Sequence, residues 1–341
     1  MRPPLRPPCG EDDPPRRKYA LPFPCRDFYI IRMSVTPSPP GPFDRPAVRH
    51  RRTRAAGTLA EADFLLAHVR ASVEERLEDV NRRFSRIAVV GAGDGSVARM
   101  LRDRYAPDVL VQVDGSSAMA RSAKAAVPEA LTITGDEEAL PLAEEAFDLI
   151  VAPLTLHAVN DLPGALIQMR RALAPDGLLI AAMLAGDTLA PLRDALARAE
   201  IETVDGVSPR VSPMADLRDL GGLLQRAGFA LPVADKETVT VRYASPLRLL
   251  HDLRAMGESN ALAERRRVFL RRDTLGRAME ILAQDHADDE GKVPIRFDIA
   301  FLHGWAPSPE QQQPLRPGSA MMRLADALKT TERPLRDDAG H

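Results

Sequence analysis

The stretch RIAVVGAGDGSVARM, residues 86–100, constrains the fold more than any other part of the sequence. An apolar run leads directly into three glycines, Gly91, Gly93 and Gly95, and the residues that follow favour a helix. This order predicts a buried strand, a tight turn and the start of a helix. Such a turn lets the backbone approach a nucleotide-like ligand closely.

Strand-like and helix-like segments alternate around this turn, over a predicted core at 84–243. We expect strands near 86–91, 109–113, 131–134, 147–152 and 178–184, and helices near 94–105, 116–126, 161–173 and 187–203. Single strands separated by helices predict an α/β fold with a mostly parallel sheet covered on both faces. Later strand-like segments, 229–243 and 295–305, flank a helical insertion at 246–284. If those two strands pair antiparallel, the insertion forms a cap over the carboxyl ends of the strands.

The two ends of the chain differ from the middle. Residues 1–42 are rich in proline and arginine without hydrophobic periodicity. We expect a disordered extension there, or a misassigned start with Met33 as the true initiator. One domain is expected over 43–320, followed by a flexible tail at 321–341.

Two segments precede the glycine turn. Apolar residues spaced by three and four predict an N-terminal amphipathic helix over 58–82, which would lie across one end of the domain. Ahead of it, FDRPAVRHRRTRAAG, residues 43–57, is strongly basic. The simpler interpretation of the arginines at 48–54 is an ordinary solvated face. Docking of an acidic partner, or closure over the site, is the alternative.

Composition narrows the class of protein. The formal net charge of −2 gives no reason to expect nucleic-acid binding. No apolar run approaches the roughly 20 residues of a membrane-spanning helix, so we expect no stable membrane insertion. Both cysteines, Cys9 and Cys25, lie in the N-terminal extension. This excludes a disulfide framework in the core, and a cytoplasmic location fits.

The glycine turn also indicates which ligand binds. The pattern G-x-G-x-G ends at Gly95, and Ser96 stands where a dinucleotide site has its third glycine. Asp94 would repel a pyrophosphate at the helix N-terminus, whereas a zwitterionic or cationic ligand is better tolerated. S-adenosylmethionine (SAM) is such a ligand. We therefore predict SAM as the cofactor, with an NAD-dependent oxidoreductase as a disfavoured alternative.

Carboxylates follow the next two predicted strands. Asp114 could accept both hydroxyls of a ribose, with a helix N-cap as the structural alternative. Asp136 could accept the adenine amino group, with a solvated turn as the alternative. The predicted cofactor-binding residues are Gly91, Gly93, Asp94, Gly95, Asp114, Gly115, Asp136, Glu137 and Leu154.

Methyl transfer from a sulfonium depends mainly on positioning, and it requires a general base only for a poor nucleophile. His157, in the loop after the fourth strand, is the predicted catalytic residue; a structural histidine is the alternative. The seven histidines are scattered along the chain, and we predict no metal site. GESN, residues 257–260, would end one helix and cap the next, or alternatively form a lid over the ligand.

Several stretches resemble one known family. GAGDG, VDGSSAM, GDEEALPL and FDLIVAPLTLHAVNDLPGAL occur in the order typical of class I SAM-dependent methyltransferases. FDRPAVRHRRTRAA, GDTLAPLRDALARAE and DLRAMGESNA resemble a narrower branch, over about residues 43–320. That branch holds the malonyl-carrier-protein methyltransferase of biotin synthesis and a mitochondrial complex I assembly factor that hydroxylates an arginine of an iron–sulfur subunit.

The resemblance implies a Rossmann-like, seven-stranded sheet, SAM as cofactor and methylation of a protein side chain or carrier-bound acyl group. The implied partner is an acyl carrier protein or a complex I iron–sulfur subunit. Alternatives are a non-methylating assembly factor, an arginine hydroxylase, or a malonyl-carrier-protein methyltransferase.

Three positions depart from the family pattern. Val89 stands where members usually have the acid that holds the methionyl amino group, Ala92 replaces a cysteine, and Ala158 replaces an aromatic residue. Loss of one charged hydrogen bond weakens binding roughly ten- to a hundredfold unless Asp94 or the loop after the fourth strand compensates.

Overall fold

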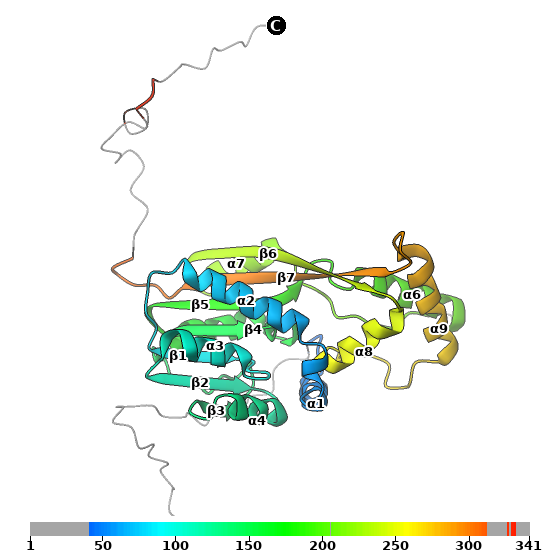
Figure 1. Ribbon diagram of the computed structural model, residues 1–341, viewed down its shortest axis with the longest axis horizontal. Helices are drawn as coiled ribbons and strands as arrows, with labels where there is room; N and C mark the ends of the chain where they lie inside the picture. Colours follow the sequence, from blue (N-terminus) through cyan, green and yellow to red (C-terminus); the bar gives the residue numbers. More distant parts are fainter. Residues whose placement is uncertain (1–40, 205, 312–325, 327–328, 332–341) are drawn as a thin grey trace, which may run out of the picture.

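The computed structural model of the chain describes residues 41–204, 206–311, 326 and 329–331. Figure 1 shows a single sheet with helices packed against it and a group of helices beyond one end. The disorder expected for 1–42 and the tail expected for 321–341 fall almost wholly outside the described residues.

Seven strands form one sheet in the order β3-β2-β1-β4-β5-β7-β6. Neighbours among the first five strands pair parallel, whereas β7 is antiparallel to both β5 and β6. The strands are Arg86–Val90 (β1), Val109–Asp114 (β2), Leu131–Thr134 (β3), Phe147–Pro153 (β4), Leu173–Ala185 (β5), Ala230–Tyr243 (β6) and Val293–Trp305 (β7). The predicted fold class is confirmed, and the two late strands pair as expected.

Successive side chains of each strand point to opposite faces, so the sheet has a core on each side. Ile87 belongs to the core that α2, α3, α6, α8 and α9 cover, whereas Ala88 belongs to the core under α5 and α7. The helices of the described residues are Arg45–Ala55 (α1), Leu59–Glu61 (η1, 3-10), Phe64–Glu78 (α2), Ser96–Tyr105 (α3), Ser117–Ala126 (α4), Leu156–Ala158 (η2, 3-10), Leu162–Ala172 (α5), Ala190–Val204 (α6), Leu217–Arg226 (α7), Pro246–Met256 (α8) and Arg272–His286 (α9).

Two expectations about the helices need correction. The amphipathic helix expected over 58–82 is shorter, and the basic segment before it forms a helix, α1, that the periodicity did not predict. In the insertion at 246–284, Gly257 ends α8 as expected, in a left-handed conformation at φ 87°, but the next helix does not follow directly. Residues 257–271 lie outside any helix, so neither Ser259 nor Asn260 is the N-cap of the next helix.

A buried carboxylate joins the end of β5 to β7. The side chain of Asp298 is fully buried, and it accepts hydrogen bonds from Thr238 Oγ1 at 2.7 Å and from the guanidinium of Arg296 at 2.8 Å. It also accepts one from the backbone N–H of Asp187, in the loop after β5. Burial raises the pKa of Asp298, but these hydrogen bonds outweigh it and lower the pKa to about 2.

Replacing this carboxylate tests its contribution to stability. Because the folded pKa lies below the ordinary value of 3.8, the contribution is full above that value and is lost as the pH falls through about 2. We expect Asp298→Asn to lower the free energy of unfolding by about 2 kcal/mol near neutral pH. Urea unfolding should show this difference reduced by roughly half at about pH 3. An equal difference at both pH values would contradict this origin.

Candidate functional site

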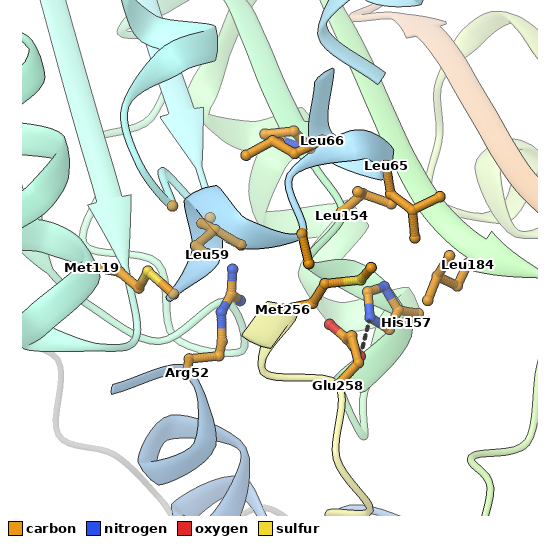
Figure 2. A pocket seen from close by; sticks show the side chains of 14 residues that line it. Arg52, Leu59, Leu65, Leu66, Met119, Leu154, His157, Leu184, Met256 and Glu258 are labelled. Atoms are coloured by element: carbon orange, nitrogen blue, oxygen red, sulfur yellow. Dashed lines mark hydrogen bonds and ion pairs between the residues drawn. The ribbon is translucent and has the colours of Figure 1, made fainter. Parts of the chain in front are cut away.

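The candidate site lies at the carboxyl end of the parallel strands. From β1 the chain crosses to β2 on one side, while β4 lies on the other, so the loops after β1 and β4 face each other. Between them is a cavity of about 50 Å³, whose lining includes Gly91, Gly93 and Leu154 from these loops. Figure 2 shows side chains from α1, η1, α2, the end of α8 and Glu258 around this cavity.

Two of the three glycines in the turn line this cavity. The N–H groups of Gly91 and Ala92 both donate to the carbonyl of Val113, which ties the turn to β2. A side chain at Gly91 would collide with Thr155 at 2.5 Å. At Gly93, with φ 56°, an added Cβ would meet nothing nearer than 3.9 Å, so its methyl group would enter the cavity.

Gly95 and Asp94 have structural roles. An added Cβ at Gly95, where φ is 80°, would lie 2.7 Å from Ala126 Cβ and 2.9 Å from Ala123 Cα. Gly95 therefore allows the start of α3 to pack against α4, and it does not line the cavity. Asp94 accepts a hydrogen bond from the N–H of Ser96 at the start of α3. Their predicted ligand contacts stay predictions.

Gly95→Ala should destabilise the fold, because it combines a collision with a strained left-handed alanine. We expect a loss of about 2 kcal/mol or more in the free energy of unfolding, measured in urea. Gly222→Ala is the matched control, since nothing lies within 4 Å of a Cβ added in this helical position. The control should be neutral or stabilise by up to about 1 kcal/mol. Equal stability of the two variants would contradict the packing role of Gly95.

The predicted acids after β2 and β3 lie side by side. Asp114 is fully buried and accepts from the N–H groups of Gly93 at 3.0 Å and Ser116 at 2.8 Å. Glu137 is 3% exposed and accepts from Thr155 Oγ1 at 2.6 Å. Its carboxylate lies 3.5 Å from a Cβ added at Gly115. The N-cap of α4 is Ser116, so Asp114 does not serve as that cap.

Arginines of α1 form ion pairs with these acids. Arg45 bonds to both Asp136 and Glu137, with 2.6 Å to Asp136, and Arg52 lies 3.3 Å from Glu137 and 3.7 Å from Asp114. The side chains of Arg45 and Arg52 are only 10% and 15% exposed. Of the arginines at 48–54, for which a solvated face was expected, Arg52 is therefore not solvated, and the alternative of closure over the site describes its placement. Burial raises the pKa values of Asp136 and Glu137, but the arginine charges lower both below their usual range.

A sequence signal exists for the helix and for its arginine face, although not for their partners. Asp44 accepts a hydrogen bond from the N–H of Ala47 and caps α1, with a proline in the first turn. Arg45, Arg49 and Arg52 are then spaced by four and three, which puts them on one face of a helix. Arg49 completes the set, with its guanidinium 2.7 Å from Asp136.

The loop after β4 brings His157 into the cavity wall. Leu154 has a left-handed backbone at φ 47°, unusual for a branched residue, and lines the cavity. His157 Nε2 lies 3.1 Å from Glu258 Oε2, and Glu258 lines the same cavity (Figure 2). Glu258 was not among the predicted site residues, although the GESN segment was considered as a lid. Val89 is buried in the core.

In the described part of the chain, no group of three or more His, Cys, Asp or Glu residues is placed to hold a metal ion. No helix within those residues is both long and apolar enough to span a membrane.

Comparison with known proteins identifies relatives along most of the chain. Residues 88–181 match the methyltransferase domain family. The chain is 38% identical to the mitochondrial arginine-hydroxylase NDUFAF5 of Danio rerio over 84% of its length and 89% of the relative's. It is 35% identical to the arginine-hydroxylase NDUFAF5 of Homo sapiens, over 87% of this chain and 86% of the relative. It is 30% identical to the malonyl-[acyl-carrier protein] O-methyltransferase of Gallionella capsiferriformans, over 84% of this chain and 98% of the relative.

Proposed function

Because this chain belongs to the SAM-dependent methyltransferase family, in the branch of arginine-hydroxylase NDUFAF5 and the malonyl-[acyl-carrier protein] O-methyltransferases, we propose that it binds SAM at the turn after β1. The proposed activity is methylation of a protein side chain or a carrier-bound acyl group. The observation that carries this proposal is the cavity over Gly91 and Gly93, next to the carboxylate of Asp114.

The residues around the cavity fit SAM in kind. Gly93 leaves open space for close approach of a ligand, and Asp114, Asp136 and Glu137 supply acceptors for ribose hydroxyls and an adenine amino group. SAM, when bound, supplies a methyl group on a positively charged sulfur. Once the α1 arginines move away, the carboxylates at the strand ends leave a net negative charge, which favours a ligand that carries a positive charge.

The size of the cavity indicates that α1 has to move. A volume of about 50 Å³ is far below the roughly 300 Å³ of small-ligand sites. Arg45 and Arg52 fill the region of the carboxylates that SAM would use. We therefore propose that SAM and the α1 arginines compete for the same acids.

Titration of the purified protein with SAM by calorimetry tests binding. We expect wild-type protein to bind, and Gly93→Ala to lose affinity about tenfold or more, because its methyl group enters the cavity. Gly222→Ala is the control and should bind as wild type does. No heat and no thermal shift at millimolar SAM would contradict the proposal.

Hydrogen exchange tests the movement of α1. When SAM is added, we expect amide exchange in residues 45–55 to become faster, because the arginines lose their buried partners. Exchange in α5, on the opposite face of the sheet, should not change. Slower exchange in α1 on binding would show that the helix stays closed over the ligand.

The arginine-hydroxylase relatives favour a second candidate function, action on an arginine of a complex I iron–sulfur subunit, with or without methylation. Incubation of the protein with such a subunit, and in parallel with malonyl-carrier protein, separates the candidates by mass spectrometry. An added methyl group supports methyl transfer, whereas an added oxygen atom supports hydroxylation.

The proposed location is the cytoplasm. The two vertebrate relatives named above are mitochondrial proteins by name, so a mitochondrial location is the alternative. Cell fractionation with an antibody against this chain distinguishes the two.

A further inference from the structure

The imidazole of His157 has one partner and one unused nitrogen. Its side chain is 5% exposed, and Nε2 lies 3.1 Å from Glu258 Oε2. Nδ1 is buried, and no group in the described residues forms a hydrogen bond with it. Buried polar atoms are nearly always paired, so an unpaired one at the wall of a cavity indicates a group that a ligand completes.

Glu258 determines which ring nitrogen of His157 donates a hydrogen bond and which one has no partner. Burial raises the pKa of Glu258, but His157 and Arg52 together outweigh it and lower the pKa. An ionised carboxylate only accepts hydrogen bonds, so a neutral ring facing Glu258 donates through Nε2–H at 3.1 Å and has its lone pair on Nδ1. The Glu258 backbone is held at the end of α8, where its N–H donates to the carbonyl of Leu253 at 2.8 Å.

We infer that Glu258 is a positioning residue that orients His157 as the general base of the reaction, an inference that rests on the proposed methyl transfer. The carbon–sulfur bond of SAM breaks as the bond from the methyl carbon to the acceptor atom forms. The proton of the acceptor atom moves to His157 Nδ1, and Glu258 balances the charge of the resulting imidazolium. The proton then leaves to water, so no oxidant or reductant is needed.

This arrangement selects the chemical class of the acceptor. An amine, a guanidine or a hydroxyl carries a proton near neutral pH and needs a base when it is methylated. A carboxylate, such as the free end of a malonyl group, is already ionised and needs none. The His157–Glu258 pair therefore favours a nitrogen or hydroxyl acceptor on a protein over a malonyl thioester.

The tautomer of His157 is the first test, and it requires no ligand. In full-length protein labelled with ¹⁵N-histidine, we expect NMR to show His157 protonated at Nε2 and unprotonated at Nδ1. Glu258→Ala should lose this preference. His251→Asn is the control, because His251 lies on α8 with 52% of its side chain exposed, and it should leave the His157 signals unchanged. A wild-type His157 protonated at Nδ1 would overturn the inference.

Methyl transfer is the second test, with two probes and labelled SAM. One probe is malonyl-CoA; the other is a pool of capped peptides that contain Arg, Lys, Ser and Tyr and no acidic residue. We expect label in the peptides, reduced about a hundredfold in His157→Asn and about tenfold or more in Glu258→Gln. The affinity of both variants for SAM is measured in parallel by calorimetry, and the rates are compared at saturating SAM, so that a loss of turnover is separated from a loss of binding.

Other outcomes separate this inference from the proposed function. Label in malonyl-CoA at an undiminished rate in His157→Asn, or no label in the peptides while SAM is bound, overturns the inference and leaves SAM binding intact. A Glu258→Gln variant that loses SAM affinity but keeps the tautomer also overturns it, because the carboxylate would then hold the ammonium of the ligand. If SAM does not bind wild-type protein, the proposed function fails, and the tautomer alone decides whether the pair is formed.

Discussion

Ion pairs between α1 and the carboxyl ends of β2 and β3 determine the state of the whole site. Arg45 and Arg52 are largely buried against Asp114, Asp136 and Glu137. A buried charge that loses its partner costs several kcal/mol, so neither the helix nor the acids can be exposed alone at low cost. We propose that SAM replaces the arginines by offering the same carboxylates other hydrogen-bond donors, the ribose hydroxyls and the adenine amino group. Closure of the cavity and the proposed binding of SAM therefore depend on the same carboxylates.

The three glycines of the turn meet three different requirements. Gly91 makes room for Thr155 from the loop after β4, Gly93 leaves the cavity open, and Gly95 admits α4. Only the second requirement concerns a ligand directly. The spacing G-x-G-x-G thus reflects packing of the neighbouring loop and helix as much as recognition, which is why the same turn can precede several kinds of nucleotide site.

Much of the fold could be predicted because its signals are local. Each parallel strand is an apolar run bounded by turn residues, and the bounds of β1, β2, β3 and β4 agree with the expectations to within about one residue. The prediction failed where local signals were weak. The arginine-rich α1 lacks the apolar periodicity used to predict helices, and the buried face of the helix carries arginines that pair with acids after β2 and β3. In the cap, the end of α8 at Gly257 was expected, but the start of the next helix was placed at Ser259 or Asn260, whereas α9 begins at Arg272.

The sequence by itself determined the order of the strands along the chain, the glycine turn and the acids that follow β2 and β3, because each depends on residues close together in the chain. It also carried the family resemblance. Only the tertiary structure decided what faces those residues. Arg45 lies 91 residues from Asp136, and His157 lies 101 residues from Glu258. No short-range pattern encodes such pairs, because they form only when the sheet places the loop after β4 beneath α1 and the end of α8.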